Sequence, residues 1–226
     1  MSKILVTGGT GMIGKALQNI LGDKGIYLSS KDCDLVDFNQ TIRTFEKHKP
    51  EYVIHLAAKV GGVVANMNYL GDFFRENILM NTNVLEVSRL FDVKKVVSLL
   101  STCIYPDKCE YTLVEQNVHS GRPHHTNYAY AHAKRMLDVQ SRAYRDQYGC
   151  NFITAVPNNL FGKYDNYDLE NGHVIPAMIR KFHEANQNNG DVVLWGSGDP
   201  LREFTYSEDL AKILVFLLEN YDERDP

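Results

Sequence analysis

Thr7-Gly8-Gly9-Thr10-Gly11-Met12-Ile13-Gly14 comes directly after a short apolar run and opens a segment with helical spacing. Glycines at positions 8, 11 and 14 permit a tight turn and let backbone N–H groups at a helix N-terminus approach a pyrophosphate. A lone glycine triplet also fits an ordinary strand-to-helix turn, but here both the strand and the helix that a dinucleotide site requires are expected. This stretch therefore predicts a Rossmann-type α/β fold with a dinucleotide site.

The first two-thirds of the chain alternates short β-branched runs with longer segments of helical spacing, which is typical of a doubly wound parallel sheet. The predicted strands are Lys3 to Thr7, Ile26 to Ser29, Tyr52 to His55, Lys95 to Leu100 and Asn151 to Val156. The predicted helices between them are Met12 to Gly22, Phe38 to His48, Leu70 to Phe91 and Asn127 to Tyr148.

After Val156 the sequence becomes rich in Pro, Asn, Gly and aromatic residues, as in loops that could build a substrate pocket. We predict a helix from Val174 to Ala185, a strand from Val192 to Trp195, and a helix from Ser207 to Glu219 that Ser207 caps. We therefore expect a dinucleotide-binding domain formed by residues 1–162 with 203–222, and a partial, truncated substrate lobe over residues 163–202.

The composition narrows the classes of function. The chain has 226 residues, a net charge of -4 and 23% charged residues, without a sustained Lys/Arg block. This argues against nucleic acid or a membrane surface as the main partner. The four cysteines lack C-x-x-C spacing and the density of a disulfide scaffold, so we expect reduced thiols and no structural metal. We expect a cytoplasmic protein, because no signal peptide or spanning segment is evident.

Tyr130-Ala131-His132-Ala133-Lys134 is the second informative stretch. On a helix, Tyr130 and Lys134 point from the same face, so the ammonium would lower the phenol's pKa and help it exchange a proton with a substrate oxygen. A Tyr and a Lys at this spacing are often only neighbours on a helix surface. The pair indicates catalysis here because the same chain also contains the glycine turn of a dinucleotide site. Ser101, at the carboxyl end of a predicted strand, could donate to a substrate carbonyl. Together they predict redox chemistry at a carbonyl.

The end of the second predicted strand reads Ser29-Ser30-Lys31-Asp32. NAD sites usually place a carboxylate here to bind the ribose 2′-hydroxyl, whereas NADP sites offer room and a cation for the 2′-phosphate. Lys31 and the two hydroxyls favour NADP, although a solvated loop lysine is nearly as good an interpretation and Asp32 is adjacent. We predict NADP, used as NADPH, as the cofactor.

Several stretches together resemble a known family: Thr7 to Gly14, His55 to Gly62, Ser101 to Pro106, Tyr130 to Lys134, Pro157 to Gly162 and Gly172 to Pro176. Over essentially its whole length the chain is similar to the GDP-L-fucose synthases, which are extended short-chain dehydrogenase/reductases. The resemblance implies epimerisation at C3 and C5 of GDP-4-keto-6-deoxy-D-mannose, followed by NADPH-dependent reduction at C4 to give GDP-L-fucose.

The resemblance also implies roles for individual residues. Cys103 and His173 match the family's acid/base pair, and a thiol and an imidazole both suit proton transfer near neutral pH. Without the resemblance, Cys103 is better explained as a small core residue and His173 as a loop residue. The expected catalytic set is therefore Ser101, Cys103, Tyr130, Lys134 and His173.

Two sets of binding residues complete the expected site. The cofactor set is Gly8, Gly9, Thr10, Gly11, Met12, Ile13, Gly14, Lys31, Leu99, Leu100, Ser101, Thr102, Tyr130, Lys134, Pro157, Asn158, Asn159, Leu160 and His173. By resemblance, the GDP-sugar set is Lys181, Trp195 and Arg202. Cations suit a diphosphate and an aromatic ring suits a base or sugar, but Trp195 could equally anchor a core and Lys181 could be solvated.

Members of the resembled family continue into a C-terminal lobe that this chain nearly all lacks. We therefore expect the dinucleotide site to form, with nucleotide-sugar affinity and turnover reduced or absent. A homodimer through a four-helix bundle is expected by analogy, with Phe73, Leu85, Met136 and Tyr144 as apolar surface, unless a monomer uses them as its core. The alternatives are another extended reductase-fold nucleotide-sugar epimerase or dehydratase, and a non-catalytic NADP-binding module.

Overall fold

The computed structural model describes residues 3–109, 112–169, 172–194, 196–199 and 201–226. Its body is a parallel sheet with strand order β2-β1-β3-β4-β5. The strands are β1 (Ile4–Thr7), β2 (Gly25–Leu28), β3 (Tyr52–His55), β4 (Lys95–Leu99) and β5 (Phe152–Ala155). The predicted Rossmann-type sheet is confirmed, and each strand end lies within one residue of its predicted position.

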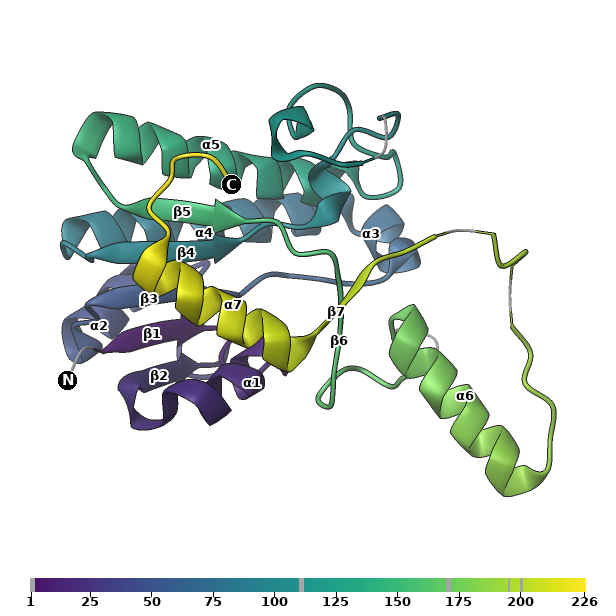
Figure 1. Cartoon of the computed structure of the whole chain (residues 1–226). Helices are drawn as coiled ribbons and strands as arrows, with labels where there is room; N and C mark the ends of the chain where they lie inside the picture. The colour runs from purple at the N-terminus through teal and green to yellow at the C-terminus, as the bar shows by residue number, and fades with distance from the viewer. Residues whose placement is uncertain (1–2, 110–111, 170–171, 195, 200) are drawn as a thin grey trace.

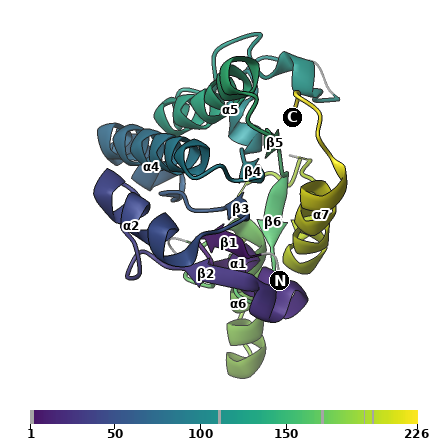
Figure 2. The ribbon, with the colours of Figure 1, turned by 90° about the vertical axis from the view of Figure 1, so that its left-hand side faces the viewer.

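Helices cover both faces of the sheet, as Figures 1 and 2 show. On one face lie α2 (Phe38–His48), α4 (Leu70–Leu90) and α5 (Tyr128–Tyr148), and on the other α1 (Met12–Leu21) packs against α7 (Ser207–Asn220). Successive strand residues serve opposite faces: Val53 joins the core under α4 and α5, and Ile54 joins the core under α1 and α7. The strands are therefore apolar without a break, because both faces are buried.

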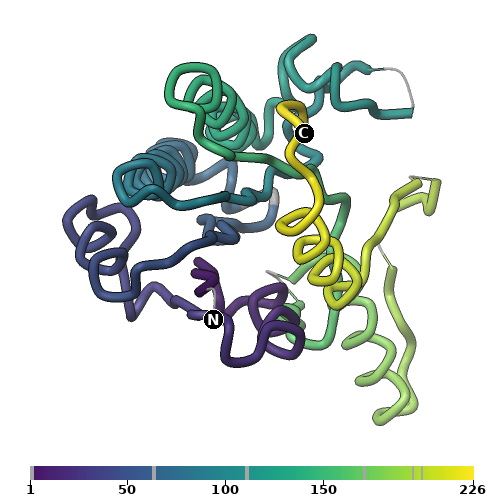
Figure 3. Tube along the Cα trace, turned by 60° about the vertical axis from the view of Figure 1, so that its left-hand side comes forward, coloured from purple at the N-terminus to yellow at the C-terminus, as the bar shows by residue number. Residues whose placement is uncertain are grey.

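Two short strands and one short α-helix were not predicted, and neither were three 3₁₀ helices, η1 (Gly22–Lys24), η2 (Thr102–Ile104) and η3 (Glu115–Asn117). β6 (Asn159–Phe161) and β7 (Phe204–Tyr206) form a separate two-stranded parallel sheet, and α3 (Val63–Asn68) precedes α4. Between β6 and β7 the chain makes an excursion that carries α6 (Val174–Asn188), which lies apart from the main sheet (Figures 1 and 3). Elements this short carry too little periodicity to be recognised in a sequence.

The strand predicted from residue 192 is wrong over residues 192–194, which form no regular element, and Trp195 lies outside the described residues. No neighbouring strand is paired with residues 192–194, and Val193 and Leu194 are exposed. An apolar run alone does not make a strand without a partner for its backbone groups.

The predicted capping role of Ser207 is also wrong. Ser207 lies inside the first turn of α7, and Tyr206 precedes the helix. Ser207 is buried against the end of β6, where a Cβ placed on Gly162 would lie 2.0 Å from the Ser207 hydroxyl oxygen. The small residues at both positions let α7 begin directly against β6.

The apolar residues predicted for a dimer surface are mostly core residues. Phe73 and Leu85 are buried, and Tyr144 is half-buried, with its hydroxyl donating to a Glu86 carboxylate oxygen at 2.8 Å. Only Met136 of the four is exposed. The apolar side chains that α4 and α5 do expose are Phe74, Leu79, Leu90, Tyr128, Met136, Val139 and Tyr148.

Within the described residues, no helix combines the length and the apolar character needed to cross a bilayer.

Candidate active site

The glycine turn lies between the carboxyl end of β1 and the start of α1. Gly8 has a φ of 66°, which side-chain-bearing residues rarely adopt, and a Cβ on Gly14 would lie 2.4 Å from the Gly9 carbonyl carbon. Gly11 precedes α1 without a side-chain cap, and the first turn contains no acidic residue. The first N–H groups of α1 and the positive end of its dipole are thus available to an anion, and the turn fits the pyrophosphate of a dinucleotide.

The loop after β2, residues 29–32, contains the residues expected to meet the 2′-phosphate of NADP or the ribose 2′-hydroxyl of NAD. An Asp32 carboxylate oxygen accepts from the Ser29 N–H at 2.8 Å and from the Ser29 hydroxyl at 2.5 Å. The hydroxyl bond is the main reason that the pKa of Asp32 is lowered. Asp32 is therefore engaged by its own loop, whereas Ser30 and Lys31 are exposed. This arrangement suits the 2′-phosphate of NADP better than a free ribose hydroxyl.

The N-terminal half of α5 brings Tyr130 and Lys134 over the end of β4. Lys134 is 2% exposed, and its Nζ donates to the carbonyl oxygen of Leu99 at 2.8 Å. Burial lowers the pKa of Lys134 to about 8. Burial also raises the pKa of Tyr130, Cys103 adds to the rise, and a hydrogen bond with the Ser101 side chain opposes it. The predicted lowering of the Tyr130 pKa is wrong, because desolvation of the phenol dominates.

Cys103 lies in a 3₁₀ helix (Thr102–Ile104) that follows Ser101. The Ser101 hydroxyl oxygen accepts from the Cys103 N–H at 3.5 Å, and the thiol is half-buried. Burial raises the pKa of Cys103, while Ser101, Lys134 and Arg135 act in the opposite direction. The structure therefore brings together four of the five predicted catalytic residues, namely Ser101, Cys103, Tyr130 and Lys134.

A buried hydrogen-bonded chain below this cluster was missed in the sequence. Thr7 Oγ1 accepts from the N–H groups of Leu56 and Ala57 at 3.1 and 3.2 Å, so its hydrogen is directed to His55 Nδ1 at 2.7 Å. His55 Nε2 then carries the ring proton and donates to Asn81 Oδ1 at 3.0 Å. Burial lowers the pKa of His55 to about 4, with a further contribution from Lys134, so the ring is neutral.

These hydrogen bonds connect the end of β1 to α5, because Asn81 Nδ2 lies 3.5 Å from the carbonyl oxygen of Ala133, the residue before Lys134. Thr7 and His55 are paired in the register of β1 and β3, and both end their strands. Two polar residues ending neighbouring parallel strands were therefore the signal available in the sequence.

Comparison with known proteins agrees with this geometry. Residues 4–226 match the model of the NAD dependent epimerase/dehydratase family. The chain belongs to this family. A GDP-L-fucose synthase of Dictyostelium discoideum is 49% identical over 99% of the chain and 72% of its own length. A probable GDP-L-fucose synthase of Drosophila melanogaster is 46% identical over 100% of the chain and 74% of its own length.

Among solved structures of the epimerase/dehydratase fold, a GDP-L-fucose synthetase from Naegleria fowleri bound to NADP superimposes with a TM-score of 0.93. It is 46% identical and covers 100% of this chain, which in turn covers 75% of that structure. The chain thus spans about three quarters of the length of these relatives.

Other predicted cofactor residues of this epimerase/dehydratase chain lie at the end of β4 or follow β4 and β5. The side chains of Leu99 and Leu100 are buried in the core, so each can offer only main-chain atoms, and Lys134 already binds the Leu99 carbonyl. Asn158 Oδ1 is buried and has no hydrogen-bond partner in the described part of the chain, which leaves it available to a ligand. The Asn159 amide instead donates to the Glu203 carbonyl at 3.0 Å.

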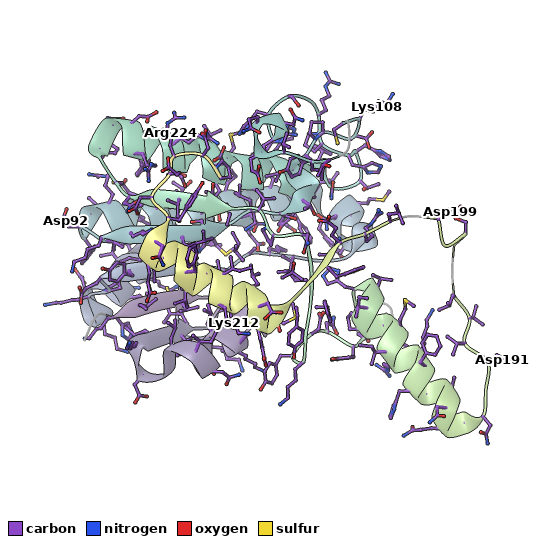
Figure 4. The ribbon with its side chains drawn as sticks, viewed as in Figure 1. Asp92, Lys108, Asp191, Asp199, Lys212 and Arg224 are labelled. Atoms are coloured by element: carbon purple, nitrogen blue, oxygen red, sulfur yellow. The ribbon has the colours of Figure 1, made fainter. Side chains whose placement is uncertain are left out.

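The residues predicted for the GDP-sugar are carried by the excursion between β6 and β7. His173 is exposed immediately before α6, and in the described residues no hydrogen bond joins it to Cys103. Lys181 Nζ donates to the Val193 carbonyl at 3.0 Å, and Arg202 is exposed. Asp191 and Asp199, labelled in Figure 4, mark how far this segment lies from the sheet. In the described part of the chain, no hydrogen bond joins His173 or Arg202 to Ser101, Cys103, Tyr130 or Lys134.

Proposed function

We propose that this chain epimerises C3 and C5 of GDP-4-keto-6-deoxy-D-mannose and reduces C4 with NADPH, giving GDP-L-fucose. The observation that carries the proposal is the placement of Ser101, Cys103, Tyr130 and Lys134 together at the sheet edge that holds the glycine turn. Reduction of a ketone needs a proton donor such as Tyr130, whereas epimerisation needs an additional group that exchanges carbon-bound protons. The similarity to GDP-L-fucose synthases supports this nucleotide sugar as the substrate.

The epimerisation uses the acidity of the two C–H bonds beside the keto group. A base removes each proton, an acid returns one to the opposite face, and Cys103 and His173 are the proposed pair. Ser101 and Tyr130 donate hydrogen bonds to the enolate oxygen and stabilise the negative charge that develops there. The proposal requires His173, which immediately precedes α6, to face the same sugar as Cys103.

The reduction uses the same donors. When bound at the glycine turn, NADPH supplies the hydride to C4. Tyr130 gives its hydroxyl proton to the C4 oxygen, and its raised pKa keeps the proton on the phenol until that moment. Lys134 lies one helical turn after Tyr130 and is held in place by its hydrogen bond to the Leu99 carbonyl. Its positive charge stabilises the phenolate that remains on Tyr130.

We assign these tasks to two regions. Residues 1–162 with 203–222 form the cofactor-binding domain, and residues 163–202 form a substrate-binding region that offers Lys181, Trp195 and Arg202 to the GDP. Support comes from β6 and β7, which lie side by side where the chain leaves and re-enters the main body. We place the activity in the cytoplasm, since the four cysteines are free, as suits a reducing compartment.

We further propose a homodimer in which α4 and α5 of two copies form a four-helix bundle. Leu79 and Val139 lie on the outer surfaces of these helices and are 37% and 43% exposed. A Leu79→Glu substitution should give a monomer in sedimentation velocity, because a carboxylate would be buried in an apolar contact. Leu201→Glu, at a position 92% exposed on the excursion, is the matched control and should leave the dimer intact. A wild-type monomer at micromolar concentration would contradict the assembly.

One coupled assay tests the activity. GDP-4-keto-6-deoxy-D-mannose is added with NADPH in D₂O, NADPH absorbance is followed, and the product is analysed by NMR. We expect stoichiometric NADPH oxidation and GDP-L-fucose with deuterium at C3 and C5. A reduced sugar without deuterium would instead indicate another nucleotide-sugar reductase of this fold. Tight NADPH binding without turnover of any GDP-keto sugar would indicate a non-catalytic NADP-binding module.

A further inference from the structure

Arg135 is a buried cation to which the reaction described above gives no role. It follows Lys134 on α5 and is 5% exposed. Its Nε donates to the Ile104 carbonyl at 2.6 Å, and its Nη1 donates to the Gly121 carbonyl at 2.7 Å. Its Nη2 is buried without a hydrogen-bond partner among the described residues. Burying a guanidinium is costly, and the two bonds to backbone carbonyls offset part of that cost.

The two carbonyls belong to opposite ends of the loop that connects β4 to α5. The ends lie together, because the Asp107 N–H donates to the Arg122 carbonyl at 2.8 Å and a Cβ on Gly121 would lie 3.0 Å from the Pro106 side chain. The planar guanidinium of Arg135, on α5, links the two ends of the loop by donating to the Ile104 carbonyl at one end and to the Gly121 carbonyl at the other. A lysine has no such planar fork and would have to hold both carbonyls from a single nitrogen, which fixes their relative positions less well.

One of the bridged ends carries the reactive thiol. Ile104 is the last residue of the 3₁₀ helix that contains Cys103, and its side chain is fully buried. Ser101 holds the start of this helix through the Cys103 N–H, and Arg135 holds its end through the Ile104 carbonyl. The position of the thiol is therefore fixed from both sides.

Arg135 also contributes charge. The charged or titratable groups that act on Cys103 come from α5 and are Tyr130, Lys134 and Arg135. Burial lowers the pKa of Lys134 to about 8, so the Lys134 ammonium loses its proton as the pH rises through that value. A guanidinium stays protonated throughout this range, and its hydrogen bond to the Ile104 carbonyl holds Arg135 at the residue that follows Cys103. The effect of Arg135 on the thiol is smaller than that of Lys134, but it persists at pH values where Lys134 is neutral.

We propose that Arg135 is the positioning residue for Cys103: it clamps the 3₁₀ helix through the Ile104 carbonyl and keeps a permanent cation beside the thiol. The sugar chemistry of Cys103 rests on the proposed function, whereas the clamp and the charge do not. Arg135 thus serves the proton exchange at carbon, and Tyr130 and Lys134 serve the transfer at oxygen.

The first experiment needs no turnover. The full chain is alkylated with iodoacetamide over a range of pH, and the modified Cys103 peptide is quantified by mass spectrometry. Arg135→Met should raise the midpoint of the pH profile by up to about one unit and slow alkylation at neutral pH by up to about tenfold, because one cation near the thiol and the clamp on its 3₁₀ helix are lost. Arg122→Met removes an exposed arginine of the same loop and should leave the midpoint unchanged. Equal midpoints in the two variants would overturn the proposal.

The second experiment uses Arg135→Lys, which keeps a positive charge and guards against misfolding of the methionine variant. We expect deuterium exchange into the sugar to slow at least tenfold, with NADPH affinity unchanged, because the clamp is lost. Exchange at the wild-type rate would overturn the positioning role. If the wild-type chain does not act on the sugar but Arg135→Met still moves the thiol midpoint, the proposed function fails and the role of Arg135 stands.

Discussion

The sheet edge and the α6 excursion are built in opposite ways. At the sheet edge, Lys134 and His55 are buried and bonded to groups from other elements, which hold them before any ligand arrives. On the excursion, Arg202 and His173 are exposed, and the apolar side chains of Ile179 and Phe182 are more than half exposed. Under the proposed function, the groups for proton transfer are therefore held in place by the fold, whereas Arg202 and His173, which are assigned to the sugar nucleotide, are exposed to solvent.

The largest expected effect comes from the preorganised region. Tyr130→Phe removes the proton donor while keeping the ring, which contacts Phe73 edge-on with 6.5 Å between centroids. We expect kcat to fall by about 10²- to 10⁴-fold, the usual loss when a general acid is removed. NADPH affinity, followed by fluorescence titration, should change little, because the glycine turn is untouched. Turnover within tenfold of wild type would show that another group supplies the proton.

An intermediate effect is expected for pH-dependent stability at His55. Its pKa is about 4 in the folded chain against an ordinary 6.5, so between these values only the unfolded chain binds the proton. Stability should therefore fall as pH is lowered from about 6.5 to 4, by up to about 3 kcal/mol from this residue. Urea unfolding at several pH values measures the slope.

His55→Leu should lose that acid-dependent slope and also lose about 1–3 kcal/mol at neutral pH, because the Thr7 hydroxyl and Asn81 Oδ1 are left without their partner. His183→Asn, at an exposed position on α6, is the matched control and should keep the wild-type slope. An unchanged slope in His55→Leu would mean that other groups cause the acid sensitivity.

The smallest effect is expected on the excursion. Arg202→Met removes an exposed guanidinium whose Nη1 donates to the neighbouring Leu201 carbonyl at 3.0 Å. Calorimetric titration with GDP should show affinity lowered a few-fold, with NADPH affinity and urea stability unchanged, because solvent-exposed charge contacts contribute little. A loss beyond a hundredfold would show that Arg202 is already buried in a formed nucleotide site.

The sequence predicts the parts of the site that are local. The glycine turn and the Tyr130–Lys134 spacing each fall within one strand-turn-helix or one helical turn, so spacing alone places them. The parallel strands were equally predictable, because both faces are buried and their apolar runs are continuous.

The rest depends on which elements meet. Asn81 reaches His55 only because α4 packs beside β3, and Arg135 reaches Gly121 only through a long loop. The rise in the Tyr130 pKa follows from tertiary burial, which spacing does not report. Periodicity identified α4 as amphipathic but could not tell whether Phe73 and Leu85 face this chain's own sheet or another subunit.

The parallel pairing of β6 and β7 has a consequence for how such a protein can diversify. Asn159 lies opposite Phe204 and Phe161 lies opposite Tyr206. The excursion leaves from β6 and returns at β7, so this pairing fixes the distance between its two ends. We expect that a segment of different length or composition can replace the excursion between β6 and β7 without altering the path of the main sheet. If residues 163–202 bind the sugar nucleotide, as proposed above, their exchange would be a route by which one hydride-transfer scaffold acquires a new sugar specificity.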